Sequence, residues 1–452
     1  MPLVETRFPS VYSLQQLAVE AASGPRLKSP QSDSKRVVSE LAGSSLPKIT
    51  FGRSKSFQRK RIRSSEEAVV PDVDYPSSDD SSSLSPEASS PESGLAVVPA
   101  SEPFKSTGIY GDSEDDLEQV GSLLDTILLA EWEDRAQRGL FRYDVTCCPT
   151  KTVPGAYGFI AQFNEGRLSK KRPTEFRVDQ VIQKFDPAKF NFTKALETEV
   201  LFQFEQLGDG EGPMTYHEDS TCPASPDLVL INVSPIEYGH VLLVPRVLDS
   251  LPQLADPATV LLALRFCQQA DNPSFRLCFN SLGAYATINH LHFQAYYLTA
   301  PFAVERAPTV PLPGWRKRRD VSICTLEEYP VRALVFETGV AFNQMAELVG
   351  SACERLAAAN IPHNLFVVDS GQRVFLFPNG FAMAKAKGAI PADLLESQVD
   401  PAGFEISGHL ILKRKEDYEN VTQEWVWRLL SFACLSDEEF DGFTQLALGE
   451  PA

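Results

Sequence analysis

The sequence predicts an α+β protein with a mostly antiparallel sheet and helices on one side of it. Residues 226–298 read as strand, turn, strand, helix, strand, strand, and residues 331–378 again place strands around one amphipathic helix. The turns are short and contain Gly, Pro or Ser, which is how antiparallel strands are usually joined. Strands and helices that are grouped in this way are typical of the α+β class. Apolar residues make up 43% of the 452 residues, enough for a large core.

Residues 1–115 are predicted to be disordered. They hold 25 serines and 11 prolines and few aromatic residues. Ordering a residue costs about 1–2 kcal/mol in backbone entropy, and this stretch has too little apolar surface to offset that cost. The basic run Arg53–Arg63 is either a nuclear-localisation patch or a solvated part of the tail. Serines between Ser77 and Ser93, some followed by Pro or an acidic residue, leave phosphorylation and regulatory partners of the tail open.

Order is expected to begin near Asp115. Apolar residues at helical spacing predict an amphipathic helix over 116–142, and residues 154–163 read as a turn and a short strand. A basic cluster follows, made of Arg167, Lys170, Lys171 and Arg172. We interpret it as a solvated loop, with a phosphate or nucleotide clamp as the alternative.

The next region supplies the centre of the sheet. Two apolar strands, Leu228–Val233 and Val241–Val244, flank a turn made of Ser234-Pro235 and Gly239. A helix is expected over 256–270, and a strand over 275–280 leads into a turn at Gly283.

The strand after Gly283 carries the residues that indicate chemistry. From Ile288 onward apolar and polar residues alternate, so His290, His292 and Gln294 share one face. Neighbours on one strand face lie about 7 Å apart, close enough for the three side chains to converge on one phosphate-sized ligand. An imidazole can be a nucleophile, a proton carrier or a metal ligand near neutral pH. The competing interpretation is a chance surface pair of histidines or a weak metal site.

The second half of the chain repeats the pattern. Residues 301–320 are Pro-rich and are predicted to be a surface linker. Beyond them we expect a strand over 331–337, a helix over 341–359 and a hairpin made of 364–369 and 373–378. Residues 405–412 echo 237–243 in a Gly-His-apolar-apolar-Leu pattern, which suggests an internal duplication. The second half has no counterpart of His-x-His, so a duplicated copy would keep the fold and lose the chemistry.

Composition excludes several functional classes. The net charge of −18 argues against general nucleic-acid binding, and no run of 18 apolar residues could span a membrane. The N-terminus lacks the apolar segment of a secretory signal. The eight cysteines are scattered and form no Cys-x2-Cys, as expected for free thiols in a reducing compartment. We expect a cytoplasmic protein without a metal site, and a nuclear pool stays open.

Several motifs together carry a family resemblance. His290-Leu291-His292-Phe293-Gln294 resembles the histidine-triad signature in its transferase form, in which Gln replaces the third His. Four segments are similar to the plant-type GDP-L-galactose phosphorylases: residues 171–177, 231–240, 280–294 and 409–418. The likeness runs from about Leu123 to the C-terminus. It implies histidine-triad-like antiparallel sheets with flanking helices and a duplicated core. The catalytic half would be 116–300, and the degenerate half 321–446.

The resemblance also implies a reaction. Such enzymes transfer the GMP group of GDP-L-galactose to inorganic phosphate and release L-galactose 1-phosphate and GDP on the route to L-ascorbate. By resemblance, His292 would attack the α-phosphorus and become guanylylated, and phosphate would then discharge it. A covalent intermediate splits one displacement into two and gives ping-pong kinetics. No cofactor is required for this covalent step.

The other roles follow the same resemblance. His290 would contact the phosphates or orient its neighbours, and Gln294 would hydrogen-bond phosphate oxygens without delivering a proton. Asn232 would hold the ribose hydroxyls, and Arg246 would either hold phosphate or cap a loop. The loop that approaches the phosphates would contain Asn280, Gly283 and Thr287. The group that selects guanine cannot be named from the sequence.

Alternative functions remain open at this point. The same chemistry on GDP-D-glucose is the nearest one, because sugar choice is not visible in the motifs. A nucleoside-polyphosphate hydrolase or adenylyl phosphorylase is a second alternative, although Gln294 argues against the hydrolase. A non-catalytic nucleotide-binding regulator is the third, and the intact His292 argues against it.

Overall fold

A computed structural model describes residues 122–167, 175–206, 214–216, 225–315, 317–318 and 320–449. The predicted tail 1–115, the basic run Arg53–Arg63 and Lys170–Arg172 of the basic cluster lie outside these residues.

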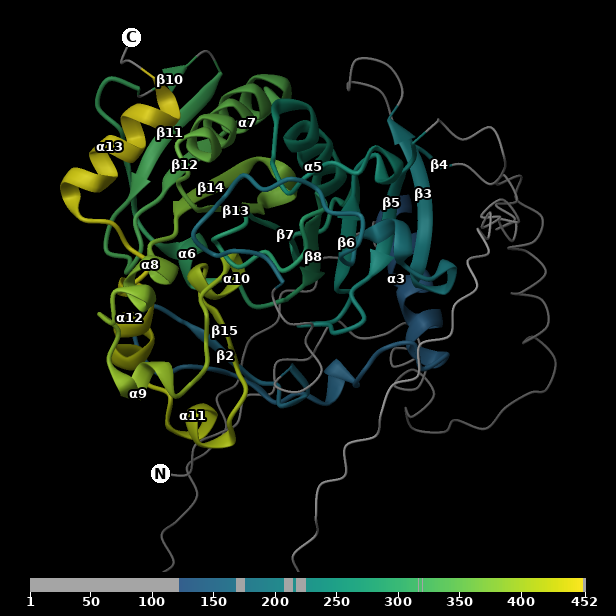
Figure 1. The fold of residues 1–452 in the computed structure, drawn as a ribbon, viewed down its shortest axis with the longest axis horizontal. Coiled ribbons are helices and arrows are strands. Elements are labelled where there is room, and N and C mark those ends of the chain that lie inside the picture. The colour runs from purple at the N-terminus through teal and green to yellow at the C-terminus, as the bar shows by residue number, and fades with distance from the viewer. Residues whose placement is uncertain are drawn as a thin grey trace, which may run out of the picture. The chain divides into compact units, whose positions relative to one another are not determined.

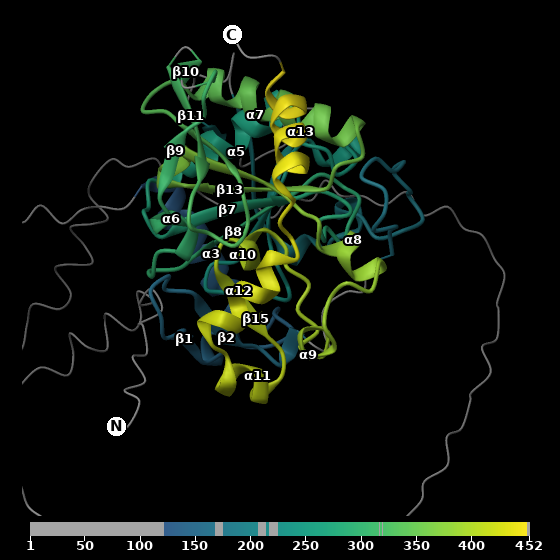
Figure 2. The ribbon, with the colours of Figure 1, turned by 90° about the vertical axis from the view of Figure 1, so that its left-hand side faces the viewer.

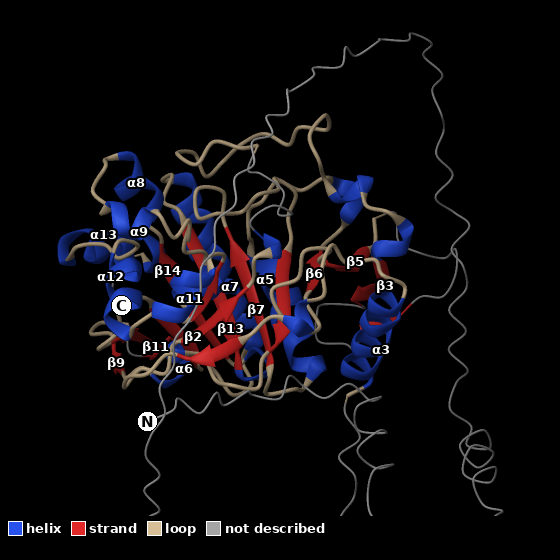
Figure 3. Ribbon diagram, turned by 90° about the horizontal axis from the view of Figure 1, so that it is seen from below, coloured by secondary structure: helices blue, strands red, loops and turns tan. Residues whose placement is uncertain are grey.

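Twelve strands of the described chain form one sheet. Its order is β10-β11-β12-β14-β13-β7-β8-β6-β5-β3-β4, and β9 pairs with β11 outside this path. All the pairings in it are antiparallel, as predicted. Figure 3 shows the central strands side by side. The strands are β3 (Val200–Gln206), β4 (Met214–Tyr216), β5 (Asp227–Ile231), β6 (Val241–Val244), β7 (Phe275–Asn280), β8 (Phe293–Tyr297), β9 (Thr309–Pro311), β10 (Lys317–Arg318), β11 (Val321–Leu326), β12 (Leu334–Glu337), β13 (His363–Val368) and β14 (Arg373–Pro378).

The sheet contains two copies of one arrangement. In chain order the first copy is β5, β6, helix α5 (Pro257–Ala270), β7 and β8, and the second is β11, β12, helix α7 (Phe342–Ala358), β13 and β14. In space the copies read β5-β6-β8-β7 and β11-β12-β14-β13, and they meet where β7 pairs with β13. The predicted duplicated core is therefore present in the topology.

The sequence echo that suggested the duplication is a coincidence. His240 lies directly before β6 in the large sheet, whereas His409 begins β15 (His409–Leu412). That strand belongs to a separate sheet, β1-β2-β15, with β1 (Thr150–Thr152) and β2 (Ile160–Phe163). The topological partner of β6 is β12, which contains no Gly-His pair.

Long helices cover one face of the sheet. Figures 1 and 2 show α5, α7 and α13 (Asp437–Leu448) on this side, and α3 (Leu123–Gln137) lies near β3. The α5 helix begins at Pro257, and the Asp256 carboxylate accepts the Thr259 N–H at 2.8 Å as its cap. Gly350 of α7 lets the two helices approach closely, because a Cβ there would lie 2.3 Å from the Pro257 nitrogen.

The opposite face is also covered, which corrects the prediction of helices on one side only. The small sheet and α10 lie there (Figures 1 and 2), and β15 pairs with β2 in parallel, joining the two ends of the described chain. The remaining helices are α6 (Ala303–Arg306), α8 (Phe381–Ala386), α9 (Ala392–Leu395), α10 (Gly403–Ile406), α11 (Lys415–Asn420) and α12 (Gln423–Ser431).

Residues 301–320 are more than the surface linker we expected. They contain α6, β9 and β10, and both Phe302 and Val304 are fully buried. Apolar side chains that pack into the core outweighed the turn propensity of the prolines.

Most other elements lie within a few residues of the predicted bounds, with two exceptions. The helix predicted over 116–142 is described as α3 and ends at Gln137, and the histidine strand starts later than predicted. It begins at Phe293, not Ile288, so both histidines precede it. Along β8 the alternation holds: Phe293, Ala295 and Tyr297 pack in the core beneath the long helices, and Tyr296 packs in the core on the other face.

Candidate active site

Side chains from adjacent strands form one row on the face opposite the long helices. Leu230 of β5 is in register with Leu242 of β6, and Leu242 is in register with Gln294 of β8. Asn280 ends the next strand, β7. The row therefore changes from apolar to polar along its length.

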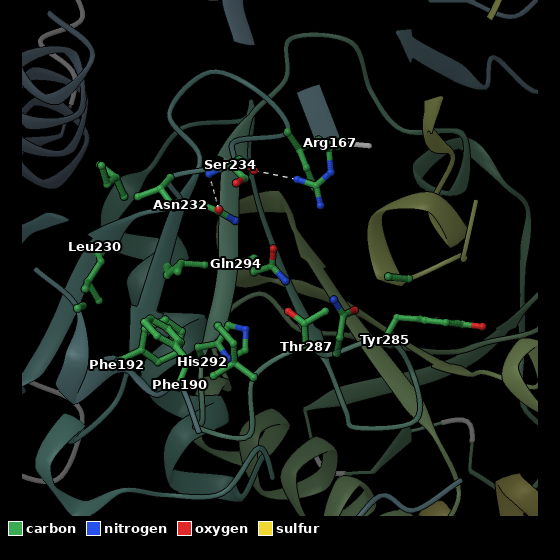
Figure 4. A pocket seen from close by; sticks show the side chains of 18 of the residues that line it. Arg167, Phe190, Phe192, Leu230, Asn232, Ser234, Tyr285, Thr287, His292 and Gln294 are labelled. Atoms are coloured by element: carbon green, nitrogen blue, oxygen red, sulfur yellow. Dashed lines mark hydrogen bonds between the residues drawn. The ribbon is translucent and has the colours of Figure 1, made fainter. Parts of the chain in front are cut away.

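This row is the floor of a cavity of about 180 Å³. Figure 4 shows Phe190, Phe192 and Leu230 together at one end, and Arg167 and Ser234 at another side, with His292 and Gln294 between them. The lining residues form an apolar end, a basic end and a set of amides and carboxylates. They include Arg142, Arg167, Phe190, Phe192, Lys194, Glu199, Leu230, Asn232, Ser234, Leu242, Asn280, Tyr285, Thr287, Ile288, His292, Gln294, Asp400 and Glu405.

His292 is held as a neutral imidazole in one tautomer. Its Nδ1 lies 2.8 Å from the carbonyl oxygen of His290. A carbonyl only accepts, so the proton is on Nδ1 and the lone pair is on Nε2. Burial lowers the pKa of His292 to about 4, and the residue is 5% exposed. A neutral imidazole with a free Nε2 lone pair is a competent nucleophile for phosphorus.

Gln253, which the sequence gave no reason to select, fixes the backbone of His292. Its Oε1 accepts the His292 N–H at 2.9 Å, and its Nε2 donates to the carbonyls of Asn280 (2.9 Å) and His292 (3.1 Å). The amide thus bridges the end of β7 and the approach to β8. It replaces the ladder hydrogen bonds that are missing before β8 begins.

His290 does not line the cavity. It is fully buried, with Phe185 and Phe192 against its ring, and its Nδ1 accepts the backbone N–H of Phe192 at 3.0 Å. Burial, chiefly, lowers its pKa to about 4. Of the two expectations for His290, the geometry favours orientation of neighbouring groups over phosphate contact. The group that it orients is the loop that carries Phe192.

Gln294 lines the cavity beside His292, and His240 supports it. The fully buried His240 ring accepts the Ile236 N–H on Nδ1 at 2.8 Å, and its Nε2 lies 3.2 Å from Nδ2 of Asn232. Gln294 hydrogen-bonds this ring, and burial holds the pKa of His240 well below its usual value. Two of the amides that line the cavity, Gln294 and Asn232, are therefore in contact with this one buried ring.

Asn232, Asn280 and Thr287, for which we predicted nucleotide or phosphate binding, also line the cavity. The Asn280 oxygen accepts from Asn364 (2.7 Å) and from the backbone N–H of Gly403 (3.0 Å). Its NH2 group is the part that remains to face a ligand. Asn280 therefore joins the two halves of the sheet to α10.

Besides His290, two predicted site residues lie outside the cavity lining. Gly283 (φ +81°) approaches the Val178 carbonyl and Pro362, where a Cβ would be 2.9 Å from that oxygen. It serves packing of the loop and does not line the cavity. Arg246 is exposed in a left-handed conformation and pairs with Asp249 at 3.7 Å, outside the cavity. Arg246 directly precedes the 3-10 turn Val247–Asp249, and its side chain makes no capping hydrogen bond there.

Two arginines form the basic end instead. Arg167 donates to the carbonyl oxygen of Ser234 at 2.8 Å, and Arg142 donates to the Ser234 hydroxyl at 3.4 Å. Arg167, which we assigned to a solvated loop with a phosphate or nucleotide clamp as the alternative, is half-buried and lines the cavity. Arg142 was missed because nothing near position 142 indicates that it reaches a turn 92 residues away.

Within the described residues no three His, Cys, Asp or Glu side chains gather as metal ligands. Seven cysteines of this part of the chain are free thiols. None of the helices described is long and apolar enough to cross a membrane.

Comparisons with known proteins agree with the motifs. Two family models match, the GDPGP1-like N-terminal domain over residues 123–296 and the GDPGP1-like C-terminal domain over 303–450. GDP-L-galactose phosphorylase 1 of Arabidopsis thaliana is 52% identical over 335 residues, 74% of this chain and 75% of that protein. Human GDP-D-glucose phosphorylase 1 is 34% identical over 67% of this chain and 77% of that protein.

Among solved structures, yeast Ap4A phosphorylase Apa2 with AMP is similar at 13% identity and a TM-score of 0.48, over 70% of this chain and 98% of that one. The two family models together span most of the chain, and the plant relative is more than half identical over three quarters of its own length. The chain belongs to the GDPGP1-like family, together with the GDP-L-galactose and GDP-D-glucose phosphorylases.

Proposed function

We propose that this protein is a GDP-hexose phosphorylase that converts GDP-L-galactose and phosphate into L-galactose 1-phosphate and GDP. The observation that carries the proposal is the His292 imidazole, buried, neutral and held with its Nε2 lone pair free beside a cavity with an apolar end and a basic end. Relatives named for this activity are 52% and 53% identical to the chain.

In the first half-reaction, Nε2 of His292 attacks the α-phosphorus. A nitrogen–phosphorus bond forms, and the bond from this phosphorus to the oxygen that bridges to the β-phosphate breaks. The hexose 1-phosphate leaves with that electron pair. The imidazole becomes a cation on attack, and the His290 carbonyl, 2.8 Å from Nδ1, stabilises the proton that remains there.

In the second half-reaction, an oxygen of inorganic phosphate attacks the same phosphorus. The nitrogen–phosphorus bond breaks, His292 returns to the neutral form, and GDP is released. The acceptor and the leaving group are both phosphates of low pKa, so neither needs a strong acid or base. Gln294 fits this chemistry because its NH2 group can bind phosphate oxygens but cannot protonate them.

Arg142 and Arg167 supply the positive charge at the phosphate end. In a ping-pong reaction the leaving sugar phosphate and the entering phosphate occupy the same place in turn. Guanidinium groups bind phosphate oxygens with planar donors that match their spacing. Both arginines are already oriented by Ser234, so little reorganisation is needed when charge develops.

The proposal also covers which hexose the enzyme prefers, and it places the enzyme on the route to L-ascorbate. The higher identity to the L-galactose enzymes supports GDP-L-galactose over GDP-D-glucose. The test is steady-state phosphorolysis of both substrates, with identification of GDP and the sugar phosphate. A kcat/KM at least tenfold higher for GDP-L-galactose supports the proposal. Preference for GDP-D-glucose would reassign the substrate, and hydrolysis without phosphate would refute phosphorolysis.

A further inference from the structure

The apolar end of the cavity has the character of a slot for a purine ring. Phe192, Leu230 and Leu242 belong to one small apolar cluster, with Phe190 and Ile288 packed against it, and all five line the cavity. Apolar and aromatic walls bind the faces of a base but cannot distinguish guanine from adenine. A polar group must therefore read the base edge.

Glu199 is the acidic side chain next to this slot. It ends the 3-10 turn Glu197–Glu199, directly before Val200, and Val200 pairs in register with Leu230 of the slot. Glu199 lines the cavity and is half-buried. Its Oε2 accepts the backbone N–H of Leu196 at 3.3 Å, which orients the carboxylate.

The backbone around Glu199 is fixed by one arginine. Arg135 of α3 donates from Nε to the Thr198 carbonyl at 3.1 Å and from Nη2 to the Val200 carbonyl at 2.8 Å. Glu131 (2.6 Å) and Asp134 (2.8 Å) hold the guanidinium in turn. The residues on both sides of Glu199 are thus anchored to a helix, so this carboxylate is positioned in advance of binding.

The other two carboxylates that line the cavity come from a different segment of the chain. Asp400 pairs with Lys385 at 2.7 Å, and Glu405 accepts the backbone N–H of Ala402 at 3.2 Å. Both belong to the segment around α10, which contacts Asn280 through Gly403. Glu199 is the carboxylate directly before β3, whose first residue, Val200, pairs with Leu230 of the slot.

We propose that Glu199 selects guanine by accepting hydrogen bonds from its N1–H and 2-amino groups. This inference rests on the proposed function, because it assumes that a guanine nucleotide occupies the cavity. A carboxylate has two acceptor oxygens and matches these adjacent donors, whereas adenine presents an acceptor at N1 and no amino group at C2. Hydrogen bonds to a charged group are stronger than neutral ones, so the discrimination is large.

The test is binding of GDP, IDP and ADP to the full-length protein by calorimetry, which needs no turnover. IDP lacks only the 2-amino group. The wild-type protein should bind GDP at least tenfold more tightly than IDP, and ADP more weakly still. In Glu199→Gln and Glu199→Ala, GDP binding should weaken about 10- to 100-fold, and the GDP/IDP ratio should fall to within threefold.

The matched control is Glu197→Gln, two residues away on the same turn, exposed and outside the cavity lining. It should keep the wild-type affinities and ratio. An unchanged GDP/IDP ratio in both Glu199 variants overturns the inference while leaving the proposed function intact. If that unchanged ratio comes from equally weakened binding of GDP and IDP, Glu199 contacts the ribose or a phosphate instead of the base. Failure of the wild-type protein to bind GDP at all would refute the proposed function itself.

Discussion

The Nδ1 atom of His292 lies 2.8 Å from the carbonyl oxygen of His290, the residue two positions before it. This local contact chooses the tautomer of the candidate nucleophile without any acidic partner. It also shows that two histidines so close in sequence have different structural roles. The backbone of His290 orients His292, while the side chain of His290 binds the backbone of Phe192.

Guanylylation should be insensitive to pH over most of the neutral and mildly acidic range. Burial lowers the pKa of His292 to about 4, so the ring stays neutral and nucleophilic as the pH falls through 6.5. His290, the titratable neighbour, also has its pKa lowered to about 4. The rate of adduct formation in single turnover without phosphate should be flat from pH 8 to 5.5. A half-maximal loss near pH 6.5 would contradict a buried neutral His292.

Loss of Gln253 should damage both stability and chemistry. Gln253→Ala leaves three backbone groups near the nucleophile unsatisfied, which should cost about 2–4 kcal/mol of unfolding free energy. Misplacement of His292 should also lower kcat at least tenfold. Urea denaturation and steady-state kinetics measure the two effects. Gln268→Ala, which removes a half-buried amide bonded to Arg265 alone in the helix, should change stability by less than about 0.5 kcal/mol.

Arg167→Gln should impair the steps in which phosphate leaves or enters. Removal of one guanidinium from a partly enclosed phosphate site should lower the rates of both half-reactions by about 10- to 1000-fold. Rapid-quench measurements of guanylylation and of its discharge by phosphate separate the two. Arg246→Gln is the matched control and should stay within about twofold of wild type. The reverse pattern would return the phosphate role to Arg246.

Glu237 should make the protein less stable as the pH rises, which is unusual for a carboxylate. Burial raises its pKa to about 7, offset in part by hydrogen bonds from the Tyr238 N–H (3.0 Å) and Gln162 (3.2 Å). The folded protein keeps the Glu237 carboxyl protonated to higher pH than the unfolded chain does. The contribution of this proton to folding stability is therefore full below about pH 4.5 and is lost as the pH rises through 7.

Glu237→Gln removes that ionisation and should stabilise the protein by about 2–3 kcal/mol at pH 8, with little effect at pH 5. Thermal or urea unfolding at the two pH values measures the difference. The exposed Glu438→Gln serves as the control with no such dependence. An equal effect of Glu237→Gln at pH 5 and pH 8 would rule out an ionisation that is linked to folding.

The sequence predicted the parts of this fold that depend on local pattern. The apolar spacing in α5 and α7 and the short turn between β13 and β14 are local properties, and these elements formed close to their predicted places. The predicted alternation around Gln294 holds from Phe293 onward. The parallel pairing of β15 with β2 was missed because nothing in either strand encodes a partner some 250 residues away. The prediction that the Gly-His pattern around His409 marks the duplication was wrong for the same reason.

The candidate site likewise contains residues that local motifs predicted and residues that they did not. His292, Gln294, Asn232, Asn280 and Thr287 belong to recognisable motifs, and they converge on one cavity. The residues that support them come from distant segments. Gln253 reaches across 39 positions to His292, and the guanidinium of Arg142 reaches Ser234. Such partners become visible only when the strands are placed side by side.

The most direct measurement is the intact mass of the purified protein after incubation with GDP-L-galactose in the absence of phosphate. We expect the mass to increase by one GMP group. The increase should be absent in His292→Asn and should be discharged as GDP when phosphate is added. Normal phosphorolysis without any mass gain would contradict a covalent intermediate on His292. No adduct and no turnover with any GDP-hexose would refute the enzyme assignment.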